Sequence, residues 1–430
     1  MSKRLLLLAS ARSYRYQAFS DAAQKLGLEV VLGLDVPPPF LPRMCDCLAL
    51  DYRDHNRALK AIERYAAQHP LRAVLGMDDS GVVLAARAAA ALGLPHNAPD
   101  AAEAAADKGR MRQRFAAAGV PSPRFHVSSL IADPEDVLEQ IGEKGIGFPC
   151  VLKPTRLSAS KGVMRADDPQ QFVERFRRLQ AICAKAGCDE FIVETFFPGA
   201  EVALEGLLDG GRLHVLALFD KPDPLDGPFF EETIYVTPSR LPAATQQSII
   251  RTAEQACAAL GLCEGPIHAE LRVGDPAASL PAPFERGSVM VVEVAARSIG
   301  GLCSRVLRFA QSKEMTLEEL ILRQACGLPL PPLRTDQAGG VMMIPVPGAG
   351  LLKAVAGVEE ARRVPLIEEV EITAPLDNPL TPLPEGGDGY PGFIFARGET
   401  PEAVVTALRE AHRCLRFTLV PEFALTPANT

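Results

Sequence analysis

Apolar runs alternate with helical patterns along the first hundred residues of the chain. Residues 4–9 and 30–34 are continuous apolar runs, and the segment between them has apolar positions at helical spacing and ends at a glycine. The same order returns with an apolar run at 73–76 and an alanine-rich helical pattern at 81–92. A strand, a helix that a glycine ends, and another strand are typical of the βαβ unit of a parallel sheet. The pattern predicts a βαβ domain over residues 1–105.

Beyond residue 105 the pattern becomes mixed. Helical patterns occur over 108–118, 134–144, 168–186 and 401–414. Strand patterns occur over 190–220, 265–273 and 288–295. A GlyGly pair at 210–211 predicts a hairpin turn inside the first of these strand regions. At about 100–200 residues per domain, a chain of 430 residues predicts two or three domains, and we place the other two at 106–330 and 331–430. The fold class expected is therefore α/β with an antiparallel sheet in the middle domain.

Composition and charge narrow the class of protein. A formal net charge of −8 and a pI near 5.6 argue against a general nucleic-acid binder, which carries a basic face. No apolar stretch approaches the roughly 18–20 residues of a membrane span, and the run near the N-terminus is shorter than the roughly 7–15 residues of a signal-peptide core. We expect a cytoplasmic protein whose partners are neither nucleic acids nor membranes.

Cysteine and histidine give no sign of a metal site of the zinc type. The ten Cys have irregular spacings without a CxxC pair, and the seven His include no HxxxH pair. Cys45 and Cys47 are too close for a standard metal knuckle. We expect reduced, mostly buried thiols that take no part in chemistry.

Two basic segments could bind a polyphosphate. One is AspLysGlyArgMetArg at 107–112, a cationic helix start. The other is a predicted strand that ends near Lys153 and is followed by the small SASKG loop at 158–162. An ammonium supplies charge, while hydroxyls and free backbone N–H groups surround phosphate oxygens. The alternative is that these are ordinary exposed lysines beside loops.

Glutamates within apolar strands are the most informative feature. Glu270 and Glu293 each interrupt an apolar strand, and burying a carboxylate costs several kcal/mol unless it is paired or binds a metal. On neighbouring strands the two could hold Mg²⁺, which prefers carboxylates together with phosphate oxygens. The alternative is a structural ion pair with Arg272 or Arg297. The latter precedes SerIleGlyGly, a loop that a substrate could approach closely.

The region 191–206 contains a ProGly turn with a glutamate on each side, Glu194 and Glu201. Its plain interpretation is a pair of strands. Its functional interpretation is a hinge whose backbone meets an adenine edge, with Glu201 at the ribose hydroxyls.

Taken in order, these segments resemble the ATP-grasp superfamily, in particular the bacterial L-amino-acid (dipeptide) ligases of its carboxylate–amine ligase branch. The resemblance covers nearly the whole chain. It rests on DK-x₂-MR with AGVPSP, FPCVLKP with SASKGV, ETFFPGAEVALEG, the DKP at 220–222, GPIHAELRV, EVAARSIGG and the C-terminal GGVMMIPVPGAGLLKAVAGVE. It implies an ATP-grasp architecture with an N-terminal pre-ATP-grasp domain, a lid subdomain at about 120–195, a central antiparallel sheet and a small C-terminal domain.

The resemblance also implies roles for single residues. ATP would be bound by Lys108, Lys153, Ser158, Ser160, Gly162, Glu194, Phe196 and Glu201. Glu270 and Glu293 would hold Mg²⁺, or Mn²⁺ in its place. Arg297 and Lys153 would be catalytic, Arg297 by binding the substrate carboxylate and steadying charge in a tetrahedral intermediate. Substrates would be bound by Glu232, Tyr235, Arg297, Gly300 and Gly301.

The chain departs from the family pattern at two places. Many ATP-grasp enzymes carry a third metal ligand, Asn, after the second Glu, where this chain has Ala295 and Ala296. The number of metal ions is therefore left open. Where the ligases often place a substrate-binding Glu and a nearby His, this chain has Glu232 and Tyr235. The loss of the His would alter the amine pocket.

The function implied is an ATP- and Mg²⁺-dependent ligase that forms an amide through an acyl phosphate and releases ADP and phosphate. Its partners would be small-molecule carboxylates and amines, and a homodimer is the assembly that the resemblance suggests. Alternatives are carboxylation or formyl-phosphate transfer on a nucleotide precursor, and an ATP-binding regulatory protein without turnover. A dinucleotide-dependent oxidoreductase is disfavoured because ASARSYRY, not GxGxxG, follows the first strand.

Overall fold

The computed structural model describes residues 2–10, 13–42, 46–275, 287–309, 315–331, 337–387 and 389–421. The chain forms two compact units, each built from several segments of the sequence. The first unit contains Met1–Pro123, Glu201–Phe219 and Leu241–Asp336. The second unit contains Arg124–Ala200, Asp220–Arg240 and Gln337–Thr430.

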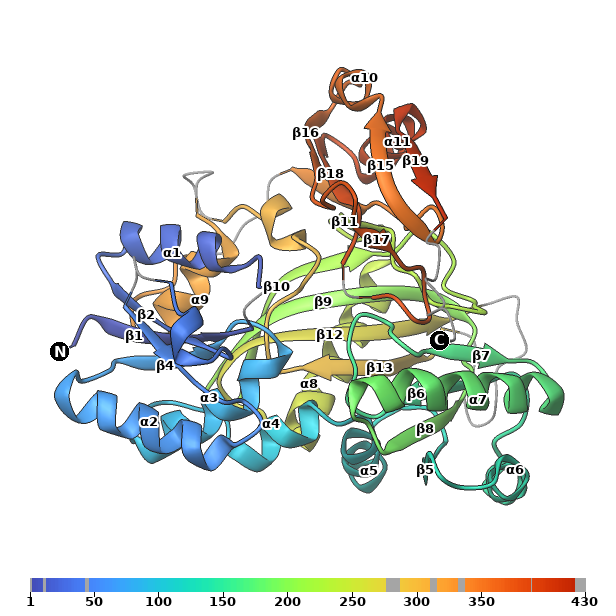
Figure 1. Ribbon diagram of the computed structural model, residues 1–430, viewed down its shortest axis with the longest axis horizontal. Coiled ribbons are helices and arrows are strands. Elements are labelled where there is room, and N and C mark those ends of the chain that lie inside the picture. The colour runs from blue at the N-terminus through green and yellow to red at the C-terminus, as the bar shows by residue number, and fades with distance from the viewer. Residues whose placement is uncertain are drawn as a thin grey trace, which may run out of the picture. The chain divides into compact units, whose positions relative to one another are not determined.

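The N-terminal part of the first unit is a parallel sheet with helices packed against it. Its elements are β1 (Arg4–Ala9), α1 (Tyr16–Lys25), β2 (Glu29–Leu34), η1 (Pro38–Phe40), β3 (Cys47–Ala49), α2 (His55–Gln68), β4 (Ala73–Gly76) and α3 (Asp79–Ala91). The strands run parallel in the order β3-β2-β1-β4. Figure 1 labels β2, β1 and β4 of this sheet. The four leucines of β1 are fully buried, because helices cover a parallel sheet on both faces. The predicted βαβ pattern is confirmed.

The rest of the first unit is an antiparallel sheet packed on helices. Its strands are β9 (Gly199–Asp209), β10 (Arg212–Asp220), β12 (Gly265–Gly274) and β13 (Val289–Ala295), in the order β13-β12-β9-β10. The helices are α4 (Pro99–Ala105), α5 (Lys108–Ala118), α8 (Ala243–Leu260) and α9 (Leu317–Ala325), with the short η2 (Cys303–Val306). Gly210 and Gly211 both have positive φ, +56° and +84°, as the predicted tight turn between β9 and β10 requires.

A small antiparallel sheet with two helices forms the N-terminal part of the second unit. Its elements are β5 (Phe125–Ser129), α6 (Pro134–Glu143), β6 (Cys150–Pro154), β7 (Met164–Ala166), α7 (Pro169–Ala186) and β8 (Glu190–Thr195), with the strand order β5-β8-β6-β7. Helices α6 and α7 pack on this sheet through an apolar core (Figure 1). In that core Phe176 of α7 meets Phe191 of β8 edge to face, with the ring centroids 5.1 Å apart.

The remaining segments of the second unit form a row of four antiparallel strands and a separate three-stranded sheet. Strands β11 (Ile234–Thr237), β14 (Ala338–Met343), β18 (Gly392–Gly398) and β16 (Ile367–Ile372) lie side by side in that order, and β17 (Pro379–Leu380), β15 (Gly350–Ala356) and β19 (Arg416–Val420) form the other sheet. Helices α10 (Val358–Arg362) and α11 (Pro401–Cys414) accompany them. The sequence predicted α11 with these bounds but no strand after it. The short segment after α11 forms β19 because it pairs with β15.

The two longest described helices, α7 and α8, have 18 residues each and bury only one face. Helix α7 carries several charged residues on its other face, among them Arg175, Arg177 and Arg178. Among the described residues, no helix combines the length and the apolar character needed to cross a membrane.

The cysteines differ from expectation at one position. Eight of them are free thiols, most of them buried, whereas Cys47 is disulfide-bonded. The expectation of reduced thiols is therefore wrong for Cys47. Burial raises the pKa of the Cys150 and Cys257 thiols to about 12, and a neutral buried thiol is a poor nucleophile.

Candidate active site

One face of the antiparallel sheet in the first unit is polar. Ile267, Ala269 and Leu271 of β12, and Val202 and Leu204 of β9, lie in the core with helices α5 and α8. Because side chains alternate along a strand, the residues between them point to the opposite face. On that face lie Glu201, Glu205, His268, Glu270 and Arg272.

Glu270 and Glu293 stand directly opposite each other in the antiparallel pair β12–β13. Directly opposed residues project to the same face of a sheet. Their side chains are 19% and 30% exposed, so solutes can reach both carboxylates. The register shifts between Glu270 and Leu271, because strand β13 has one extra residue, Val292, at this point. Like charges in this position repel, and a cation held between them would relieve the repulsion.

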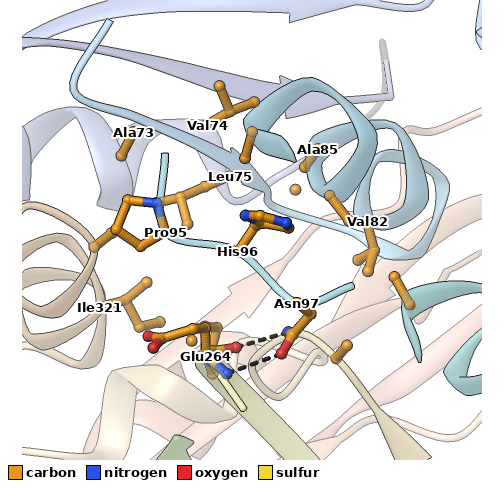
Figure 2. A pocket seen from close by; sticks show the side chains of 18 of the residues that line it. Ala73, Val74, Leu75, Val82, Ala85, Pro95, His96, Asn97, Glu264 and Ile321 are labelled. Atoms are coloured by element: carbon orange, nitrogen blue, oxygen red, sulfur yellow. Dashed lines mark hydrogen bonds between the residues drawn. The ribbon is translucent and has the colours of Figure 1, made fainter. Parts of the chain in front are cut away.

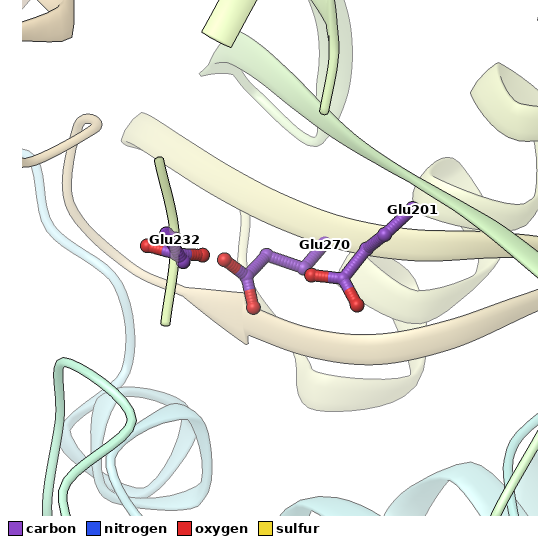
Figure 3. Close-up of side chains that lie close together, drawn as sticks. All are labelled: Glu201, Glu232 and Glu270. Atoms are coloured by element: carbon purple, nitrogen blue, oxygen red, sulfur yellow. The ribbon is translucent and has the colours of Figure 1, made fainter. Parts of the chain in front are cut away.

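Glu201 lies beside Glu270 on the same face (Figure 3). A carboxylate oxygen of Glu201 is within 4.8 Å of one of Glu270. Arg272 donates from Nε to Oε2 of Glu201 over 2.9 Å, and both side chains are buried. The sequence associated Glu201 with ribose. Its position next to Glu270 makes it a further candidate for a metal ligand.

The cationic helix start lies beside Glu293. Asp107 caps helix α5 by accepting a hydrogen bond from the Arg110 N–H, which places Lys108 in the first turn. Lys108 Nζ lies 3.3 Å from Oε1 of Glu293. Arg112 of the same helix donates to the Val292 carbonyl on β13. Lys108 and Glu293, 185 positions apart, are thereby brought together.

A buried acid and histidine behind Glu270 were missed by the sequence analysis. Glu205 is completely buried, and its Oε2 lies 3.4 Å from Nδ1 of His268, whose Nε2 is 3.6 Å from Oε1 of Glu270. Burial raises the pKa of Glu205. Burial lowers the pKa of His268, but hydrogen bonding to Glu205 and Glu270 outweighs that effect and raises the pKa to about 9. A second glutamate within an apolar strand, in AEVALEG, was the available signal.

Arg297 forms a bidentate ion pair with Asp79 at the start of α3. Nε and Nη2 donate to the two carboxylate oxygens over 2.7 and 3.0 Å. Burial raises the pKa of Asp79, but the charge of Arg297 outweighs it, so the net pKa is lowered. The pair holds the guanidinium in one orientation.

The loop after Arg297 is hydrogen-bonded to the turn after β1 and to strand β9. Arg15 donates to the backbone carbonyl of Ser298 over 3.1 Å and to its hydroxyl. The Ile299 N–H donates to both oxygens of Glu205 over 3.0 and 3.1 Å. The Gly301 N–H donates to the Tyr14 hydroxyl over 2.7 Å. The turn after β1 therefore fixes a loop almost 300 residues further along the chain.

In the second unit, Lys153 and Glu194 meet on one face of the small sheet. Lys153 pairs with Ile192 across β6 and β8, and Glu194 lies two residues further on the same face. Lys153 Nζ is 2.7 Å from Oε2 of Glu194, whose side chain is only 2% exposed. Phe196, in the turn after β8, donates its N–H to the Pro149 carbonyl over 3.1 Å.

The loop that contains Ser158, Ser160 and Gly162 connects β6 to β7. Ala159 and Ser160 both have φ of +54° and Gly162 has φ of +74°, so the backbone turns tightly here. The Lys161 N–H bonds to the Ser158 carbonyl over 3.3 Å. Left-handed φ values at residues other than glycine cost free energy and are common where a loop clamps a ligand.

Glu232 accepts two hydrogen bonds on one carboxylate oxygen. Lys221 Nζ lies 2.5 Å and the Tyr235 hydroxyl 2.7 Å from Oε1. The Lys221 ammonium also lies 4.9 Å from the centre of the Tyr235 ring, and Tyr235 is 2% exposed. Tyr235 and Lys221 therefore orient the Glu232 carboxylate.

The predicted site residues fall into two groups. In the first unit are Lys108, Glu201, Glu270, Glu293, Arg297, Gly300 and Gly301. In the second unit are Lys153, Ser158, Ser160, Gly162, Glu194, Phe196, Glu232 and Tyr235. The structure brings together Lys108 with Glu293, Glu201 with Glu270, Lys153 with Glu194, and Glu232 with Tyr235.

A separate cavity of about 80 Å³ lies in the first unit (Figure 2). Apolar side chains such as Val74, Val82 and Ile321 line most of it, and Asn97 lies at one end. The Asn97 side chain donates to the Glu264 carbonyl and accepts from the Glu264 N–H. None of the predicted site residues is among the described residues that line this cavity.

Comparison with protein families gives three matches along the chain. An ATP-grasp N-terminal domain matches residues 20–96, an ATP-grasp domain matches 146–306, and L-amino acid ligase C-terminal domain 2 matches 342–420.

Individual ATP-grasp proteins are also similar to this chain. Alanine–anticapsin ligase of Bacillus subtilis strain 168 is 27% identical over 251 residues, which are 53% of this chain and 52% of the ligase. The chain thus spans about half the length of that relative. The crystal structure of L-amino acid ligase from Bacillus licheniformis has a TM-score of 0.78 and 25% identity, and covers 97% of this chain and 99% of its own. Carboxyaminoimidazole ribonucleotide synthase from Aspergillus clavatus, complexed with ATP, has a TM-score of 0.71 at 15% identity over 96% and 98% of the two chains. That last likeness is one of fold alone.

Proposed function

Since the chain belongs to the ATP-grasp superfamily, in its carboxylate–amine ligase branch, we propose that it uses ATP to activate the carboxylate of one small molecule and joins it to the amine of another. The carboxylate is that of an amino acid, and the products are an amide, ADP and phosphate. The similarity to an L-amino acid ligase over nearly the whole chain supports this choice within the superfamily.

The opposed carboxylates carry the proposal. Glu270 and Glu293 share one face, with Glu201 beside the first and Lys108 beside the second. Carboxylate oxygens at a partly exposed position suit Mg²⁺ or Mn²⁺, which bind through a few carboxylates together with substrate phosphates. Glu270 and Glu293 would hold the ion, and Glu201 would support it. The bound ion would neutralise charge on the transferred phosphoryl group.

The first step is attack of the substrate carboxylate on the γ-phosphate. This step depends on positioning and on cancelling negative charge. Lys153 is held in place by Glu194, and its ammonium would bind phosphate oxygens. The 158–162 loop offers hydroxyls and backbone N–H groups to the same polyphosphate. Lys108 would exchange part of its contact with Glu293 for a phosphate oxygen.

The second step is attack of the amine on the acyl phosphate, after which the tetrahedral intermediate collapses to an amide and releases phosphate. Arg297 would bind the substrate carboxylate and the charge that develops on its oxygen, with Asp79 holding its orientation. Gly300 and Gly301, which follow that guanidinium in the chain, would bind the substrate through their backbone. Glu232 would bind the positive end of an amino-acid substrate, oriented by Tyr235 and Lys221.

A phosphate-release screen tests the proposal. The protein is incubated with MgATP and pairs of amino acids, with and without bicarbonate, and products are identified by mass spectrometry. We expect phosphate release that requires both a carboxylate and an amine, and a product whose mass is the sum of the two minus water. Phosphate release that depends on bicarbonate alone would indicate carboxylation instead. ATP binding without ADP formation under any pair would refute catalysis.

A further inference from the structure

Residues 381–387, a segment that follows strand β17, pack against the 158–162 loop. This contact lies within the second unit, although more than 200 positions separate the two segments. The 381–387 segment follows β17, which pairs with β15 and anchors its start. The segment meets the loop through a backbone hydrogen bond and a close backbone approach, and it meets helix α7 through an ion pair.

The hydrogen bond joins the turn of the loop to the segment. The Gly162 N–H donates to the Pro384 carbonyl over 2.9 Å, and Pro384 is buried. Gly162 has φ of +74°, and a Cβ there would lie 2.8 Å from Pro154 Cγ. The loop therefore has little room to move toward β6, and the Pro384 carbonyl fixes its other side.

The ion pair joins helix α7 to the segment. Arg178 Nε and Nη2 lie 2.5 and 2.7 Å from the two carboxylate oxygens of Glu385. This bidentate geometry sets the orientation as well as the distance. The Arg178 guanidinium also lies 5.0 Å from the centre of the Phe229 ring, which orders it further. Hydrogen bonding to Arg178 lowers the pKa of Glu385, so the pair stays ionised.

The close approach occurs at Gly387. Its φ is +101°, and a Cβ there would lie 2.8 Å from the Ala159 carbonyl oxygen and 3.2 Å from Lys161 Cβ. Ala159 and Ser160 are the two residues other than glycine that hold a left-handed φ in the loop. The backbone of the C-terminal segment thus lies directly against the part of the loop that holds these left-handed φ values.

We propose that the 381–387 segment positions the 158–162 loop for binding the phosphate oxygens of a nucleoside triphosphate. Pro384, Glu385 and Gly387 are then positioning residues for nucleotide binding, although they lie outside the ATP-grasp domain match at 146–306. Their effect is to hold a strained loop in one conformation before the nucleotide arrives. This inference rests on the proposed role of the loop in ATP binding.

Gly387→Ala is the direct test, and Gly389→Ala is its matched control. A Cβ at Gly389 would meet no atom within 4 Å, and Gly389 does not have a left-handed φ. We expect Gly387→Ala to raise the KM for ATP about tenfold, which is about 1.4 kcal/mol, while KM for the other substrates and the melting temperature change little. Gly389→Ala should match the wild type. Unchanged KM for ATP in Gly387→Ala would overturn the proposal, as would an equal rise in the KM of every substrate together with a lower melting temperature.

A charge exchange provides a second test that does not depend on the glycine. Arg178→Glu and Glu385→Arg should each weaken ATP binding in direct titration, and the double variant should recover most of the loss. A double variant that is no better than either single variant would count against the proposal.

A variant of the loop itself separates this inference from the proposed function. Ser158→Ala combined with Ser160→Ala removes hydroxyls that would contact phosphate. If that variant binds ATP more weakly while Gly387→Ala does not, the positioning role fails and the ATP-binding role of the loop stands. If neither variant affects ATP binding, both the phosphate contacts of the loop hydroxyls and the positioning role fail.

Discussion

Removing the Glu293 carboxylate should abolish amide formation and most of the thermal stabilisation by MgATP, without unfolding the free protein. In the free protein, Glu293→Ala takes away the 3.3 Å contact with Lys108, a partly exposed ion pair worth about 0–1 kcal/mol. It also relieves the repulsion with Glu270 directly opposite, which acts in the other direction. The two effects should nearly cancel, so we expect the free energy of unfolding to change by less than about 1 kcal/mol.

The stability of the protein with MgATP bound should change much more than that of the free protein. A ligand at about 100 times its dissociation constant stabilises a protein by about 2.7 kcal/mol. For a domain of about 150–250 residues this corresponds to a rise in melting temperature of roughly 5–10 °C. If Glu293 is one of the carboxylates that hold the ion against the nucleotide, most of this rise should be lost in Glu293→Ala, together with amide formation.

Thermal unfolding with and without MgATP measures both quantities. ATP with a chelator shows how much of the response needs the metal. Glu254→Ala is the control, because Glu254 is exposed on helix α8, in the part of the unit that covers the other face of the sheet. A Glu293→Ala protein that keeps the full MgATP response and comparable turnover would refute the assignment of Glu293 to the metal.

Charged side chains of the first unit give three further predictions. Because the pKa of His268 is raised to about 9, above the value of about 6.5 for a free histidine, its stabilising contribution should be complete below pH 6.5 and disappear as pH rises through 9. Urea unfolding of the metal-free protein should show this loss of up to about 3 kcal/mol in the wild type, and a smaller loss in His268→Gln. Arg272→Ala leaves the buried Glu201 carboxylate without its guanidinium and should cost about 3–5 kcal/mol of unfolding free energy, and an unchanged urea midpoint would argue against a tight pair. Asp79→Asn should raise the KM of the carboxylate substrate about tenfold through misorientation of Arg297, about 1.4 kcal/mol, with little change in KM for ATP. Equal changes in both KM values would contradict an orienting role.

Local signals in the sequence located several elements to the residue. Helix α5 begins after its cap Asp107 and ends at Gly119, whose φ is +69°. Helix α11 begins after its cap Thr400 with Pro401 in its first turn. Such signals act within a few residues, because caps and stops satisfy the backbone groups at a helix end. These cap and stop signals can therefore be recognised in the sequence without knowing what the helix packs against.

No local sequence pattern predicted the tertiary contacts at the candidate active site. Glu205 resembles any glutamate in a strand until its neighbour His268 on β12 is known, and the contact between Arg15 and Ser298 spans 283 positions. The packing of Gly387 on Ala159 could not be predicted from the sequence either. A glycine indicates that the backbone can adopt unusual φ values, but it does not indicate which residue packs against it.

The sequence alone determined the α/β class, the parallel N-terminal sheet, and the two glutamates set in apolar strands. It did so because periodicity, caps and the cost of burying a carboxylate are local properties of the chain. Only the tertiary structure decided that Glu270 and Glu293 share a face, that Glu201 stands beside them, and that a C-terminal segment contacts the 158–162 loop. Those facts depend on strand register and on which distant elements pack together, and the balance of burial over the whole chain sets both.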